Sequence, residues 1–101
     1  MSESKEINAG KIRQELLSPL TEASHARFLN QHRELVTPTD IVGFLAEGNP
    51  RISRRTLNFL LENPSYGTAD SVRRAVRTYV INSSRDSEGV AAALAILGIR
   101  G

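Results

Sequence analysis

Apolar residues recur with a helical period along most of this chain, and the pattern is clearest in residues 68–82. The apolar positions there are Val72, Ala75, Val76, Tyr79 and Val80, spaced i, i+3, i+4, i+7 and i+8. This spacing places them on one side of an α-helix. The β-branched residues of this stretch would also suit a strand, but the stripe favours a helix that begins with a capping residue at position 68, 70 or 71.

Two shorter helices are predicted before it. Thr37 can cap the first, with Pro38 in the first helical position and Asp40 three residues after the cap, and residues 48–50 end it. The apolar stripe of this helix is formed by Ile41, Phe44 and Leu45.

Ser53 is the predicted cap of the second short helix, which Asn63 and Pro64 end. Its apolar stripe consists of Leu57, Leu60 and Leu61.

The N-terminal third predicts two further helices. The first, over residues 4–17, is weakened by Gly10. The second begins with Ser18 as its cap and Pro19 in the first helical position, and runs to about residue 34. Its expected buried positions are Leu20, Ala23, Phe28 and Leu29.

The last predicted helix starts at a Ser87 cap and ends before Gly98. Eight consecutive apolar residues fill positions 90–97. A helix that is apolar on every side must be covered on every side. We therefore expect either a dimer interface through Val90, Leu94 and Leu97 or a central place in the core.

Together these elements predict an all-α fold, a small bundle of five to six helices with a trihelical helix-turn-helix-like core. The chain has 101 residues, few aromatics and no recognisable internal repeat. We expect a flexible segment at residues 1–6 and a single helical domain at 7–101. With no Cys, a disulfide framework and a thiolate zinc site are excluded.

The positive charge is concentrated in one third of the chain. Residues 51–85 carry seven Arg against two acids, whereas residues 1–50 carry five basic and seven acidic groups. Arg-rich codon usage would explain the preference for Arg over Lys equally well, but not this clustering. Because a guanidinium pairs well with phosphate and with guanine edges, the cluster indicates a nucleic-acid surface.

Residues 37–62 resemble helix-turn-helix transcriptional regulators. The resemblance covers 26 of the 101 residues and depends on Ile52, Ser53, Arg54, Arg55, Thr56 and Leu57, an order often found at the start of a recognition helix. It implies contact with double-stranded DNA in the major groove, for which the outward residues are Arg51, Arg54, Arg55 and Asn58. The turn at residues 48–51 is longer than in repressors, and the wing of winged-helix proteins is missing.

A second basic element lies in residues 71–82. Arg73, Arg74 and Arg77 fall opposite the apolar stripe, and no acid lies between Asp70 and Asp86. These Arg residues are candidates for phosphate contacts that flank the recognition helix. A solvated helix face, or ion pairs with the acidic first half of the chain, would explain them equally well.

The leading hypothesis is a homodimeric DNA-binding transcriptional regulator of the cytoplasm. The alternative is a non-enzymatic protein–protein interaction module, such as an antiactivator, antitoxin or adaptor, that docks through its apolar helix. A third option is an RNA-binding or phage architectural protein. We expect no enzyme, cofactor, metal or membrane span, because catalytic motifs are missing and His25 and His32 have no companion ligands.

Overall fold

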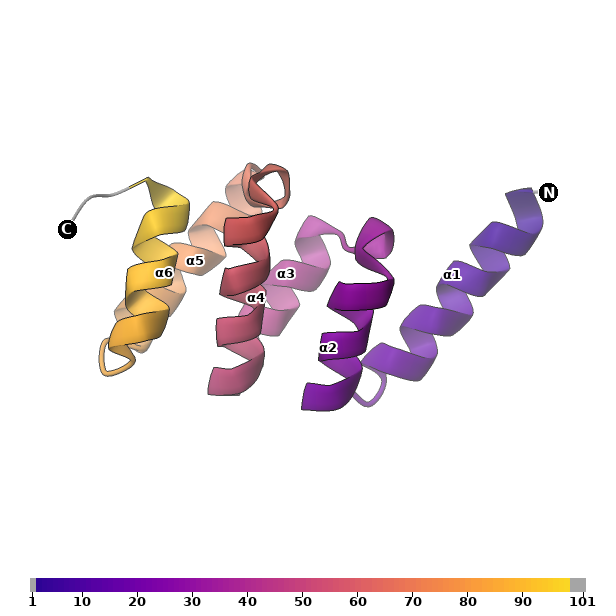
Figure 1. Ribbon diagram of the computed structural model, residues 1–101, viewed down its shortest axis with the longest axis horizontal. Coiled ribbons are helices and arrows are strands. Elements are labelled where there is room, and N and C mark those ends of the chain that lie inside the picture. The colour runs from indigo at the N-terminus through magenta and orange to yellow at the C-terminus, as the bar shows by residue number, and fades with distance from the viewer. Residues whose placement is uncertain (1, 99–101) are drawn as a thin grey trace. The chain divides into compact units, whose positions relative to one another are not determined.

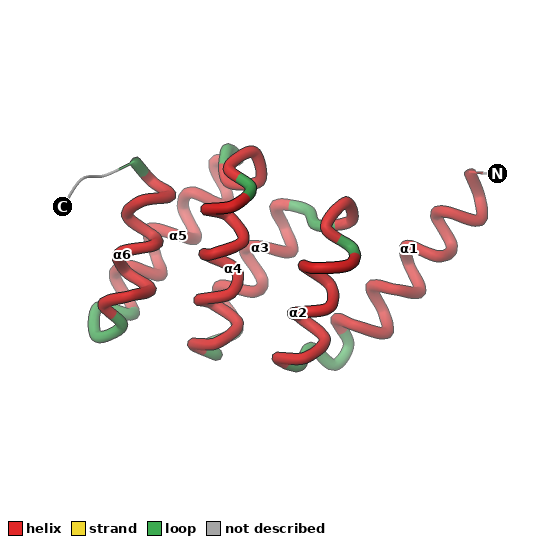
Figure 2. The backbone as a smooth tube through the Cα atoms, viewed as in Figure 1, coloured by secondary structure: helices red, strands yellow, loops and turns green. Residues whose placement is uncertain are grey.

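The computed structural model describes residues 2–98, with side chains from residue 10 onward, and within that range the protein is all-α (Figure 1). The helices are α1 (Ser2–Leu17), α2 (Glu22–Gln31), α3 (Pro38–Ala46), α4 (Pro50–Glu62), α5 (Asp70–Asn82) and α6 (Ser87–Leu97). Two short 3-10 helices, η1 (Arg33–Leu35) and η2 (Pro64–Gly67), lie in the connections. Figure 2 shows how short the remaining loops are. The predicted all-α class and number of helices are confirmed.

The tertiary contacts divide the chain into two compact units, residues 1–36 and residues 37–101. Each unit is described by itself. The expectation of one domain over residues 7–101 stays a prediction, as does the flexible segment at residues 1–6, whose side chains lie outside the described residues.

In the first unit, α2 starts later than the sequence suggested. Thr21 is its cap, and the Thr21 hydroxyl accepts from the backbone N–H of Ser24 at 3.1 Å, while the Ser24 hydroxyl accepts from the backbone N–H of Thr21 at 2.8 Å. This reciprocal pair satisfies two N–H groups at the helix start. The prediction of a start at Ser18 and Pro19 is therefore wrong.

The buried side of α2 also differs from the expectation. Phe28 and Leu29 are buried as expected, but His25 takes the third interior position, while Ala23 is exposed. The helix stops at Gln31 and continues as η1 instead of running on to residue 34. His25, Phe28 and Leu29 are spaced i, i+3 and i+4, so the stripe is helical but begins at a residue that sequence reasoning treated as polar.

In the second unit, α3 forms as predicted. The Thr37 hydroxyl accepts from the Asp40 N–H at 3.2 Å, and the Asp40 carboxylate accepts from the Thr37 N–H at 2.9 Å. Ile41, Phe44 and Leu45 are buried. The capping box and the apolar stripe are both confirmed.

Helix α4 begins four residues before the predicted position. Its cap is Asn49, whose side-chain oxygen accepts from the N–H groups of Arg51 at 2.9 Å and Ile52 at 3.4 Å. Pro50 occupies the first helical position, which suits a residue with no N–H to satisfy. Ser53 is not the cap but a buried residue inside the first turns of the helix. The turn after α3 is therefore only residues 47–49, shorter than inferred.

The four helices of the second unit form two layers (Figure 1). Helix α3 packs against α4 and α5, and α6 packs against α4 and α5, so that α4 and α6 lie side by side in one layer and α3 and α5 in the other. This is a stack of two helix pairs, the packing unit of α-solenoids. The core between the layers contains the buried faces of all four helices, among them Ile41, Ile52, Leu57, Val72, Val76 and Ala93.

Two glycines near the α3–α4 connection predict opposite effects of the same substitution. Gly48 has φ 83° and lies in the turn, whereas Gly43 lies within α3, where an added Cβ would meet nothing within 4 Å. We expect Gly43→Ala to stabilise the protein by about 0.5–1 kcal/mol, because Ala is the better helix former. Gly48→Ala should destabilise it by about 1–2 kcal/mol, because a Cβ is unfavourable at positive φ.

Urea denaturation of the two variants beside the parent chain measures both effects. Changes of the same sign in the two variants would contradict this assignment of the turn.

Candidate binding surfaces

The residues proposed to read DNA do share one side of α4. Arg51, Arg54 and Asn58 are exposed and Arg55 is half-buried, while the opposite side of the helix is buried against its neighbours. Because α4 begins at Pro50, Arg54 and Arg55 lie in its second turn and not at its first residues. Recognition helices present their N-terminal residues to the bases, so this shift moves the Arg pair back from that position.

Arg54 is engaged within the chain. Its Nε donates to both carboxylate oxygens of Asp86 at 3.0 and 3.1 Å, and its Nη2 donates to the same carboxylate. Its Nη1 lies 3.4 Å from the carboxylate of Glu88. Two parallel bonds between a guanidinium and a carboxylate make a strong, well-oriented pair. Thirty-two residues separate Arg54 from Asp86, so no local pattern in the sequence indicated the contact.

Asp86 is the centre of a small polar cluster that ties three helices together. Besides Arg54 of α4, it accepts from the Tyr79 hydroxyl of α5 at 2.7 Å and from the Gly89 N–H at the start of α6 at 3.2 Å. The hydrogen bond from Arg54, and then that from Tyr79, hold the pKa of the Asp86 carboxyl well below its usual range. Burial, and then the hydrogen bond to Asp86, raise the pKa of Tyr79 to about 12.

These shifts predict a stability that falls at both ends of the pH range. Asp86 has a lower pKa folded than unfolded, so its contribution is present above about pH 4 and is lost as the pH falls further. Tyr79 has a higher pKa folded, so its contribution is present below about pH 10 and is lost as the pH rises toward 12. In urea midpoints measured across pH, Asp86→Asn should flatten the acid limb and Tyr79→Phe the alkaline limb. Limbs unchanged in both variants would contradict the cluster.

The three Arg residues of α5 lie in the other helix layer. Arg73 donates to the Leu97 backbone carbonyl at 3.2 Å and so contacts the C-terminal end of α6. Arg74 and Arg77 are exposed. The seven Arg and Asn residues proposed for DNA binding thus come from two helices, α4 and α5, that belong to different layers (Figure 1).

Helix α6 is buried on one side only. Gly89, Ala93 and Leu97 face the core, whereas Val90 and Leu94 are half-buried, and Ala91 and Ala95 are exposed. Of the three residues expected in a dimer interface, Leu97 thus packs within its own chain. Val90 and Leu94 remain partly accessible, and Ile81 at the end of α5 is 77% exposed. The dimer stays a prediction.

A groove between α3 and α5 was not foreseen from the sequence. Its volume is about 340 Å³, and it opens to solvent on the outer side of the layer. It is lined by Val42, Leu45, Ala46, Ser71, Arg74, Ala75 and Thr78. The available signal was the lack of charge on one side of α3, where Thr39, Gly43 and Ala46 are all exposed.

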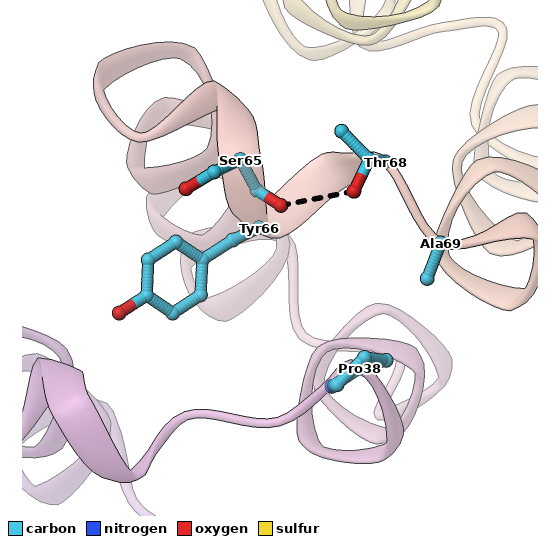
Figure 3. Close-up of a pocket in the computed structure, with 5 residues that line it drawn as sticks. All are labelled: Pro38, Ser65, Tyr66, Thr68 and Ala69. Carbon is cyan, nitrogen blue, oxygen red and sulfur yellow. Dashed lines mark hydrogen bonds between the residues drawn. The ribbon is translucent and has the colours of Figure 1, made fainter.

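The other clefts among the described residues offer less chemistry, and the smallest lies beside Arg54, Asn58 and Glu88. Figure 3 shows the one between the start of α3 and the η2–α5 connection, lined by Pro38, Ser65, Tyr66, Thr68 and Ala69. Its polar side chains are hydroxyls, and that of Thr68 donates to the Ser65 carbonyl at 3.1 Å. A larger cleft lies at the other end of the stack, beside Ser53, Asn82, Arg85 and Asp86, where Asp86 is already engaged by Arg54 and Tyr79.

No metal-ligand cluster of three or more His, Cys, Asp or Glu residues occurs among the side chains that the structure describes. His25 is fully buried and His32 half-buried. Within the described range, no helix has both the length and the apolar character needed to cross a bilayer.

Comparison of the chain with protein-family models, curated proteins and solved structures finds no match in any of the three.

Proposed function

We propose that this chain is a non-enzymatic module that binds another protein through the surface of its helical stack. The groove between α3 and α5 carries the proposal. Its walls are mostly aliphatic, with two hydroxyls and one guanidinium at the edge. An accessible apolar groove between two helices is a common docking site for a segment of a partner protein.

The packing of the second unit supports the same function. Stacked helix pairs present broad surfaces whose outer residues are not needed for the core, and α-solenoids use such surfaces for binding. Here the exposed side of α3 has only small uncharged residues, among them Thr39, Gly43 and Ala46. Because these residues contribute little to the core, the residue types at these positions can be selected for binding without a loss of stability.

DNA recognition by α4 is the second candidate. It is favoured by the common exposed side of Arg51, Arg54 and Asn58, and by a three-residue turn with Gly48 at positive φ, since helix-turn-helix motifs have a short turn of this kind. The contact of Arg54 with Asp86 weighs against it, because DNA would have to compete with a bidentate carboxylate.

Site-specific photocrosslinking in cells separates the two functions. A benzophenone amino acid replaces either Thr78 in the groove or Asn58 on α4. A third protein carries the benzophenone at position 78 together with Arg74→Glu. We expect a protein adduct from position 78 that Arg74→Glu removes, and none from position 58.

A DNA-shift assay at two salt concentrations provides the counter-test. DNA binding that weakens with salt and is lost in Arg51→Ala and Arg55→Ala would replace the protein-binding proposal with DNA recognition.

A further inference from the structure

The groove between α3 and α5 has an apolar floor and charge on one edge only. Val42, Leu45 and Ala46 of α3 face Ala75 of α5, and Arg74 is the charged residue of the lining. Arg77, one turn further along α5, is also exposed. Arg77 itself is not part of the lining.

Neither guanidinium is neutralised by a described residue of the chain. Among the side chains from residue 10 to 98, no carboxylate lies within ion-pair distance of Arg74 or Arg77. Arg54 and Arg73, by contrast, have partners in Asp86 and the Leu97 carbonyl. A cation in the lining of an apolar groove, with a second one turn further along α5, favours an occupant that brings both apolar and acidic groups.

Gly43 lies on the exposed side of α3 that carries small side chains. It is exposed, and a Cβ there would meet nothing within 4 Å, so packing within the chain does not require glycine. A glycine inside a helix nevertheless costs about 1 kcal/mol relative to Ala. Gly43 and Ala46 are three residues apart and adjacent on the helix surface. Together they leave the α3 backbone open to close approach by another chain.

We propose that the α3/α5 groove binds an acidic amphipathic helix of a partner protein. Apolar side chains of that helix would enter the groove, and its carboxylates would pair with Arg74 and Arg77. The geometry favours a helix because ridges of side chains pack into the groove between two neighbouring helices. A phosphate backbone would satisfy the arginines but leave the apolar floor without a partner. The inference rests on the proposed protein-binding function.

Fluorescence polarisation with two synthetic helices tests the proposal. Both probes have about 18 residues, or five helical turns, and share an identical Leu face. The polar face carries Glu in the first probe and Lys in the second. The full chain should bind the Glu probe saturably and at least about tenfold more tightly than the Lys probe. Arg74→Glu and Ala46→Glu should each weaken binding of the Glu probe by about tenfold or more, the scale of one lost charge-assisted contact.

Arg27→Glu is the matched control, because Arg27 is exposed on α2, in the first unit, and does not line the groove. It changes the net charge of the chain as Arg74→Glu does, and should change the affinity less than about twofold. Circular dichroism melts confirm that all three variants fold.

Equal binding of the Glu and Lys probes, or equal losses in Arg74→Glu and Arg27→Glu, would overturn the acidic helix as the occupant. If double-stranded DNA displaces the Glu probe from the parent chain and does not bind the Arg74→Glu variant, the occupant is nucleic acid and the acidic helix is overturned. If the acidic preference fails while the crosslink from position 78 to a protein persists, the protein-binding function stands with a partner of different chemistry. Loss of both results would remove both proposals.

Discussion

Leu57→Ala should lower the free energy of unfolding by about 2–5 kcal/mol, the largest effect expected of any substitution considered. Leu57 lies in the middle of α4 and is 0% exposed. Its removal leaves a cavity between the two helix layers. The neighbouring core residues Ile52 and Leu60 lie on the same helix as Leu57 and cannot move independently to fill it. The loss combines the transfer free energy of the side chain with that of the unfilled space.

Leu61→Ala is the control, since Leu61 lies one turn further along α4 and is 42% exposed. The same atoms are deleted, but we expect a loss below about 1 kcal/mol, because an exposed side chain gains little from folding. Urea denaturation followed by circular dichroism measures both variants. Similar losses for Leu57 and Leu61 would show that α4 presents a different side to the core.

Gly89→Ala is the second substitution with a large expected effect, a loss of about 1–3 kcal/mol. A Cβ on Gly89 would overlap the Tyr79 hydroxyl and the Asp86 carboxylate. The two groups would have to move apart, which breaks their hydrogen bond and disturbs the cap of α6. The better helix propensity of Ala returns at most about 1 kcal/mol, so the net effect is destabilising.

A double-mutant cycle with Tyr79→Phe identifies this mechanism. Without the Tyr79 hydroxyl the Cβ has one fewer atom to displace, so Gly89→Ala should cost less in the Tyr79→Phe background than in the parent chain. Unfolding free energies of the four proteins provide the coupling. Strictly additive effects, or a stabilising Gly89→Ala, would contradict the close contact at this position.

Local signals in the sequence were sufficient for most of the helices. The stripe of α5 and the Thr37–Asp40 capping box both depend on residues within one or two turns, and both appear in the structure. The starts of α2 and α4 were wrong because two capping residues competed for each start. In the structure the Thr21 side chain accepts one backbone N–H bond and that of Asn49 accepts two, whereas Ser53 lies buried inside α4.

Long-range contacts account for what the sequence did not reveal. The Arg54–Asp86 pair spans 32 residues, and the groove depends on how α3 and α5 lie against each other. Periodicity shows which side of a helix is apolar, but not which neighbour covers it. The same limit explains why the sequence did not indicate that the Arg residues of α4 and α5 lie on helices of different layers.

Hydrogen–deuterium exchange of the full chain, with and without the acidic helical probe, tests the central claim most directly. We expect slower exchange in α3 and α5, residues 38–46 and 70–82, at saturating probe, with α4 unchanged. Slowed exchange confined to residues 50–62, or no change anywhere while the probe is bound, would contradict docking in the α3/α5 groove.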